Sequence, residues 1–217
     1  MLYIARAHAR VHAAVQSACR VRCASEQVVY EAPPAAKDPR EAHALCCEYV
    51  GHGVISGWND GIIRFHEAGV LQWRSAGLAH RGGVCAIAWS PSFIVSGGPD
   101  GTLRVWNSAT RNHEAQFSEH RGKVTQVRID NTKPNLIHSC GEDKTVITVD
   151  LRVERRVTCH SSQDSQFQNM VQLTTSENEL LTCDHTGSVK FWDCDVPEPG
   201  MRSALSVARS LHAAVCT

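Results

Sequence analysis

The sequence has no long apolar run and no excess of either charge. Its longest uncharged apolar stretch lies around Val84–Trp89, far short of the ~20 residues that span a bilayer, so we expect no membrane-spanning segment. Lys and Arg together number 22, as do Asp and Glu, and no net charge therefore attracts the chain to nucleic acid or an anionic membrane. Hydrophobic residues make up 42% of the chain, too many for a wholly disordered protein. We therefore expect a folded chain, with neither nucleic acid nor a membrane as a partner.

The sequence also lacks an N-x-[ST] acceptor site, and its start lacks an uninterrupted apolar signal core. Ten cysteines are present, but Cys46 and Cys47 are adjacent and most of the others stand alone in apolar stretches. Such spacings do not indicate a disulfide framework. They favour a reducing compartment, so we expect a cytoplasmic protein.

A repeat of about forty residues organises the middle of the chain. Four segments align on one turn position, which is occupied by Asp60, Asp100, Asp143 and Thr186 and recurs after 40, 43 and 43 residues. An Asp-Gly turn between period-2 apolar runs is typical of a β-hairpin. This period with a Trp-Asp end is typical of the four-stranded blade of a β-propeller. The sequence therefore predicts an all-β fold.

Cations lie in the middle of three predicted strands. Arg64, Arg104 and Lys190 each stand between apolar neighbours. The alternation predicts strands with one buried face and one solvent face, and places these three cations on the solvent face.

A histidine precedes the turn in two units. These residues, His80 and His120, are 40 residues apart, and each is followed by an apolar run. The combination of loop His, strand Ser, turn Asp and strand Trp resembles the WD-repeat family over about residues 42–194. The second unit carries the full set, and the other units carry it in part. The resemblance implies a buried hydrogen-bond network that ties the strands of a blade together. Its members would be His80, Ser96, Asp100, Trp106, His120, Ser139, Asp143, Ser56, Asp60, Thr182 and Trp192.

The residue types also fit two chemical alternatives to a structural network, and the sequence disfavours both. His80, Ser96 and Asp100 are the residue types of a nucleophilic triad, but there is no G-x-S-x-G elbow and the serine recurs in register. Zinc sites use paired C-x2–4-C elements, and only Cys19 and Cys23 have that spacing. We therefore predict no catalytic residue, no metal and no cofactor.

The predicted blades occupy residues 41–196. Residues 1–40 read as a weakly ordered or partly helical extension, whose basic, acid-poor start is also compatible with a transit peptide. Residues 197–217 read as a tail. About four blades fit the repeat region, whereas propellers close with roughly 4–8. We expect an incomplete ring or part of a larger propeller, completed by another chain or segment.

One stretch resembles a narrower group. Val54–Arg64 followed by Ala79–Ile87 is similar to the cilia- and flagella-associated WD-repeat proteins of doublet microtubules. The resemblance implies a non-enzymatic scaffold of the ciliary or flagellar axoneme, with tubulin or axonemal proteins as partners. The alternative is a general cytoplasmic adaptor, in a ubiquitin-ligase or trafficking complex, with no ciliary role. Loops carry recognition, and the candidate contact residues are Arg81, Gly82, Arg121 and Lys123.

Overall fold

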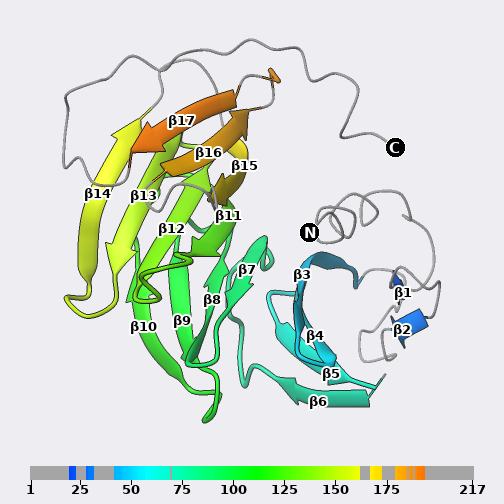
Figure 1. Ribbon diagram of the computed structural model, residues 1–217. Helices are drawn as coiled ribbons and strands as arrows, with labels where there is room; N and C mark the ends of the chain where they lie inside the picture. The colour runs from blue at the N-terminus through cyan, green and yellow to red at the C-terminus, as the bar shows by residue number, and fades with distance from the viewer. Residues whose placement is uncertain are drawn as a thin grey trace.

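The computed structural model describes residues 20–22, 28–31, 42–68, 70–161, 167–172, 179–184, 186–187 and 189–193. All regular secondary structure in these residues is β-strand (Figure 1). The expected tail, and the expected extension apart from β1 (Arg20–Arg22) and β2 (Val28–Glu31), lie outside the described residues. In the part that the structure describes, no helix has the length and apolar character needed to cross a membrane.

The strands form three four-stranded antiparallel sheets, one three-stranded sheet and the small β1–β2 pair. Each larger sheet is built from strands consecutive in the chain. Blade 1 contains β3 (Ala44–Val50), β4 (Gly53–Trp58), β5 (Ile63–Glu67) and β6 (Val70–Arg74). Blade 2 contains β7 (Ala86–Trp89), β8 (Phe93–Gly97), β9 (Leu103–Asn107) and β10 (His113–Phe117).

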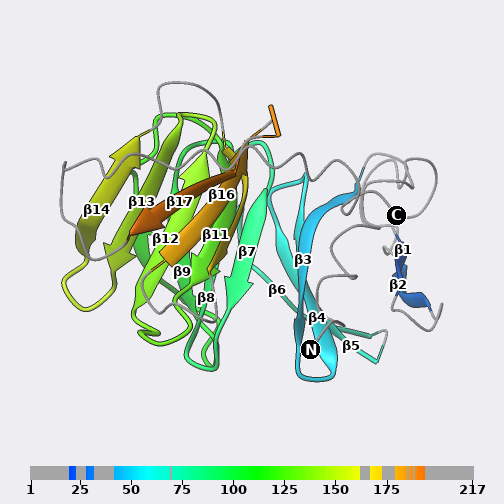
Figure 2. The same ribbon diagram turned by 45° about the horizontal axis from the view of Figure 1, so that its top comes forward.

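The second half of the chain continues the pattern. Blade 3 contains β11 (Val124–Ile129), β12 (Leu136–Gly141), β13 (Thr145–Asp150) and β14 (Arg155–Ser161). Blade 4 contains β15 (Phe167–Gln172), β16 (Glu179–Asp184) and β17 (Val189–Asp193) in the described residues. The sheets fan out as an arc of propeller blades, as Figures 1 and 2 show. The first strands of neighbouring blades are in contact, β3 with β7, β7 with β11 and β11 with β15. The predicted all-β blade architecture is confirmed.

The apolar core lies between adjacent blades. Ile55 and Ile63 of blade 1 pack in one cluster with Ile87 and Ile94 of blade 2. A second cluster joins blades 2 and 3, and a third joins blades 3 and 4. Because these apolar clusters join each blade to the next, the hydrophobic effect holds the blades together as well as the strands within each one.

The prediction that Arg64 lies on a solvent face is wrong, because Trp58 and Asp60 of the same blade cover its side chain. Arg64 is only 8% exposed. The guanidinium lies 4.6 Å from the Trp58 ring centroid and forms a bidentate ion pair with Asp60. Arg104 is half-buried and donates hydrogen bonds to the Gln116 side chain and the Leu78 carbonyl. The alternating pattern predicts the strands correctly, but a cation in that pattern does not by itself indicate an exposed side chain.

Candidate functional site

Blade 2 contains a continuous chain of side-chain hydrogen bonds. The His80 ring lies with Nε2 2.8 Å from Ser96 Oγ and Nδ1 3.1 Å from Asp100 Oδ1. Trp106 donates its indole N–H to the same serine oxygen at 3.0 Å. A neutral imidazole satisfies every group if Ser96 donates to Nε2 and Nδ1–H donates to Asp100. The chain thus links the loop before β7, strand β8, the Asp100 turn and strand β9.

Blade 3 repeats the arrangement one blade further on. His120 Nε2 is 2.8 Å from Ser139 Oγ, and Nδ1 is 3.0 Å from Asp143 Oδ2. Asp143 also accepts hydrogen bonds from the Arg121 backbone N–H and from Thr145. Val149 occupies the position of Trp106, so this chain ends at the serine, whose hydroxyl lies 3.4 Å from the Ile147 carbonyl.

These contacts shift pKa values in the hydrogen-bond networks of blades 2 and 3. Burial alone would raise the pKa of Asp143, but hydrogen bonds from His120, Arg121 and Thr145 outweigh it and bring the pKa to about 2. Burial lowers the pKa of His80 despite its hydrogen bond to Asp100. The Asp143 shift favours an ionised aspartate in blade 3, and the His80 shift favours a neutral histidine in blade 2. The stability supplied by ionised Asp143 is present above its ordinary pKa of 3.8 and is lost as the pH falls toward 2.

Blades 1 and 4 depart from this geometry. In blade 1, Ser56 Oγ accepts a hydrogen bond from the indole N–H of Trp58 at 2.9 Å, and Asp60 pairs with Arg64 instead of a histidine. In blade 4, Trp192 donates its indole N–H to Thr182 Oγ1 at 2.8 Å. The structure therefore brings the predicted network residues together within blades 2 and 3, and as the single pair of Thr182 and Trp192 in blade 4. In blade 1, Ser56 and Asp60 bind Trp58 and Arg64 rather than each other.

A second buried network lies in blade 3 and was missed in the sequence. His138 Nε2 is 3.0 Å from Asp130 Oδ2, and its Nδ1 is 2.9 Å from Thr148 Oγ1. Asp130 also accepts hydrogen bonds from the backbone N–H groups of Thr132 and Lys133. One signal was present, because Asp130 follows His120 by the same ten residues as Ser90 follows His80. Ser90 closes the corresponding turn of blade 2 by hydrogen bonds with Phe93.

His66 occupies the position that Trp106 has in blade 2, and it provides a test of burial. Desolvation, helped by nearby Arg64, lowers its pKa from 6.5 to about 4. The unfolded chain then binds a proton at a pH where the fold does not, so stability should fall between pH 6.5 and 4, by about 3 kcal/mol at pH 4. We expect His66→Gln to flatten this part of the stability–pH curve, measured by urea unfolding at pH 7 and pH 4.5.

Exposed His113 on β10 supplies the matched control. His113→Gln should keep the wild-type pH dependence. An unchanged pH dependence in His66→Gln would show that this histidine is not held neutral by burial.

The network geometry suits cohesion rather than reaction chemistry. The side chains of His80 and His120 are 0% exposed, and Ser96 and Ser139 are fully buried. A nucleophilic hydroxyl needs access for a substrate, and these two hydroxyls have none. Among the described residues, no group of three or more His, Cys, Asp or Glu side chains gathers as a metal site. Cys140 is buried in the core between blades 3 and 4, and burial raises its pKa to about 12.

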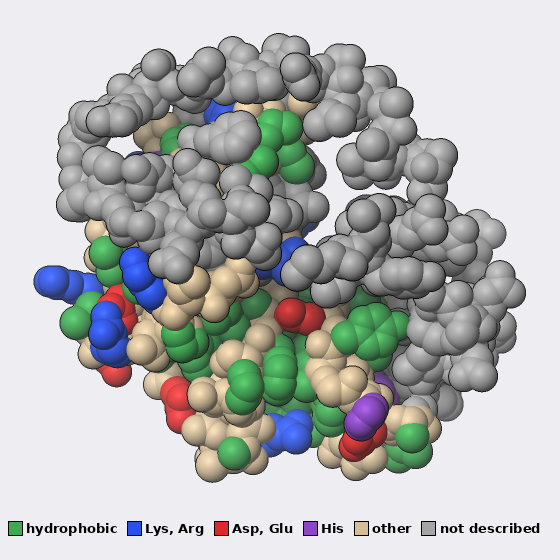
Figure 3. All heavy atoms as spheres, viewed as in Figure 1, with side chains coloured by type: hydrophobic (Ala, Val, Ile, Leu, Met, Phe, Trp, Pro, Cys, Tyr) green, Lys and Arg blue, Asp and Glu red, His purple; other side chains and the backbone are tan. Residues whose placement is uncertain are grey.

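The loops that begin at His80 and His120 present the candidate contact residues. Arg81, Gly82 and Arg121 are exposed, whereas Lys123 is half-buried and lies 3.8 Å from Glu142. The backbone N–H groups of both arginines bind the turn aspartates, which fixes the loops while the guanidinium groups remain outside. On the face shown in Figure 3, acidic and basic side chains are interspersed.

Comparison with known proteins agrees with the fold. A family model described as "WD domain, G-beta repeat" matches residues 74–107 and 111–149. A chain in the crystal structure of the mitotic checkpoint complex superposes with a TM-score of 0.63 at 21% identity, covering 69% of this chain and 49% of that one. At this identity, the superposition supports the propeller fold alone.

Similarity to curated proteins is partial. Cilia- and flagella-associated protein 52 of Mus musculus is 36% identical over 149 residues, which are 66% of this chain and 23% of that protein. Protein SOF1 of Saccharomyces cerevisiae is 34% identical over 43% of this chain and 22% of its own length. Ribosome biogenesis protein YTM1 of Meyerozyma guilliermondii is 33% identical over 43% of this chain and 22% of its own length. The chain thus spans less than a quarter of the length of these relatives.

Proposed function

We propose that this WD40-repeat protein is a non-enzymatic scaffold of the ciliary or flagellar axoneme, which binds other proteins through its blade loops. The observation that carries the proposal is its 36% identity to cilia- and flagella-associated protein 52, because the aligned stretch amounts to 66% of the chain. WD40 propellers mediate protein–protein interactions, and the arc contains WD40 repeats. Buried networks that fix the loops without exposing a reactive group support the scaffold role.

The proposed contacts are made by the loops after His80 and His120. Arg81 and Arg121 are exposed at equivalent positions of neighbouring blades. Two guanidinium groups at such positions suit an acidic protein surface, and tubulin or an axonemal protein is the partner we propose. The contact would depend on salt, because exposed charges are screened.

The ciliary proposal is tested by localisation. The tagged full chain, expressed in multiciliated cells, should give an axonemal signal that survives detergent extraction. The double variant Arg81→Glu and Arg121→Glu should fold normally, since both side chains are exposed, and should lose that signal. A wild-type signal confined to the cytosol or nucleus would contradict the ciliary role.

A second candidate is an adaptor in a complex outside the cilium. The similarity to ribosome biogenesis protein YTM1 favours it, although over only 43% of this chain. The same experiment separates the two, because a nuclear signal in ciliated cells favours this adaptor role.

A further inference from the structure

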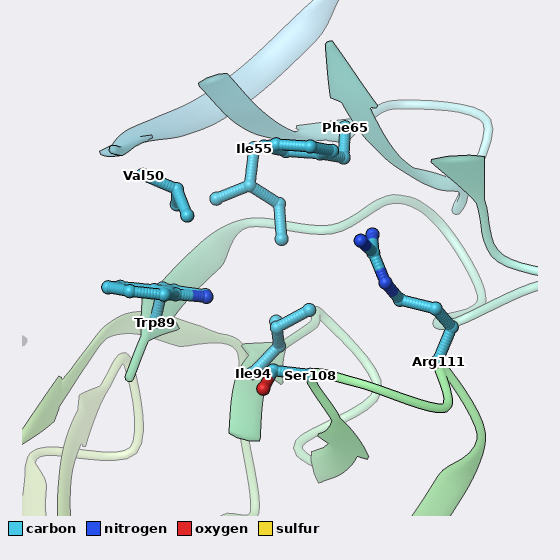
Figure 4. A pocket seen from close by; sticks show the side chains of 7 residues that line it. All are labelled: Val50, Ile55, Phe65, Trp89, Ile94, Ser108 and Arg111. Atoms are coloured by element: carbon cyan, nitrogen blue, oxygen red, sulfur yellow. The ribbon is translucent and has the colours of Figure 1, made fainter. Parts of the chain in front are cut away.

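A small pocket lies between blades 1 and 2, near the ends of β3, β5 and β7 and away from the His80 loop. It is a small hollow that is partly open to solvent. Figure 4 shows Phe65 and Trp89 on different sides of this space, with the Arg111 side chain directed toward it. Val50, Ile55 and Ile94 supply aliphatic walls. The pocket therefore combines apolar surface with a single cation.

Arg111 is held over aromatic rings rather than beside an acid. Its guanidinium carbon is 5.3 Å from the Phe65 ring centroid and 5.4 Å from that of Trp73. These distances are those of cation–π contacts. Among the described residues, no carboxylate forms an ion pair with Arg111. The guanidinium is fixed in place with its hydrogen-bond donors available to a ligand.

The backbone of the β9–β10 turn directs Arg111 toward blade 1. The side-chain oxygen of Asn107 accepts hydrogen bonds from the N–H groups of Ala109 and Thr110. The backbone carbonyl of Asn107 accepts one from the N–H of Arg111. Arg111 has φ of 65°, in the left-handed region that costs a residue other than glycine about 1 kcal/mol. This strain is retained at the position from which a side chain reaches the rings of the neighbouring blade.

We propose that this pocket binds a short segment of a partner protein in which an aliphatic side chain is flanked by acidic residues. The aliphatic group would lie between Phe65 and Trp89, and a carboxylate would accept hydrogen bonds from Arg111. A cationic ligand is disfavoured, because the Arg111 guanidinium, which lies over Phe65 and Trp73, would repel it. The inference rests on the proposed scaffold role, to which it adds a binding site and the chemistry of its partner.

The test uses a fluorescein-labelled peptide of sequence Gly-Glu-Leu-Glu-Gly-Ser and the full chain, with affinity measured by fluorescence anisotropy. We expect Arg111→Gly to weaken binding about tenfold or more while the fold is kept, because glycine adopts this φ freely. Glu154→Gly is the matched control. Glu154 has φ of 51° in the corresponding turn of blade 3, away from the pocket, and its replacement should leave the affinity unchanged.

Two altered peptides complete the test. Replacing leucine with serine, or both glutamates with glutamine, should each weaken binding to the wild-type chain by about tenfold. Equal affinity of wild type and Arg111→Gly, equal affinity of the glutamine peptide, or no binding of the parent peptide would overturn the proposal. Localisation tests the scaffold role separately. An axonemal signal without peptide binding would contradict only the pocket proposal. Peptide binding without an axonemal signal would contradict only the ciliary role.

Discussion

Replacing Asp143 with alanine is expected to lower the free energy of unfolding by about 3 kcal/mol. The substitution removes the acceptor of hydrogen bonds from His120, the Arg121 backbone and Thr145 at once. It takes the ionised partner from Nδ1 of a buried imidazole, which keeps only the Thr145 hydroxyl at 3.1 Å, and it leaves the Arg121 N–H without its acceptor. Urea unfolding followed by tryptophan fluorescence measures the change, and thermal unfolding gives the matching fall in Tm.

The neighbouring residue supplies the control for this experiment. Glu142 lies in the same turn, but its ion pair with Lys123 spans 3.8 Å between side chains that are about 40% exposed. Such surface pairs contribute about 1 kcal/mol or less. Glu142→Ala should therefore leave Tm nearly unchanged. If Asp143→Ala lowered Tm no more than Glu142→Ala does, the buried hydrogen-bond network would not be what stabilises the blade.

Gly61→Ala is the substitution with the second largest expected effect, about 3 kcal/mol of destabilisation. Gly61 has φ of 78°, and a Cβ placed there would lie 2.2 Å from the backbone oxygen of His80. The Gly61 carbonyl also accepts hydrogen bonds from the N–H groups of Ala79 and His80. Neither backbone segment can move without disturbing the loop that carries the blade 2 network.

Gly51→Ala separates the two causes. Gly51 has a similar φ of 58°, but no atom lies within 4 Å of its added Cβ. It should cost about 1 kcal/mol from the left-handed conformation alone. Comparable urea midpoints for the two variants would show that the close approach of the blade 1 turn to the His80 loop does not exist in solution.

The repeat made the blades predictable. The turn residues Asp60, Asp100 and Asp143 and the period-2 apolar runs are local signals, and each β-hairpin of blades 1 to 3 forms where they lie. The chains from His80 and His120 could be anticipated because their residues recur at fixed offsets from those turns.

Other features depend on side-chain contacts that the repeat pattern does not encode, some within one blade and some between blades. Arg64 is buried because the Trp58 ring and Asp60 surround it. The Asp130–His138 network was missed because its histidine lies inside an apolar strand with no counterpart in the other units. The Arg111 pocket exists only where blade 2 packs on blade 1, so its chemistry could not be read from either repeat alone.

The central claim is that the His–Asp contacts hold a blade together. A double-mutant cycle on blade 3 tests it most directly, with urea unfolding of the wild type, His120→Ala, Asp143→Ala and the double variant. The account predicts a coupling energy of about 2 kcal/mol, because the two side chains meet at 3.0 Å in a buried site. Additive losses, with no coupling between the two positions, would contradict it.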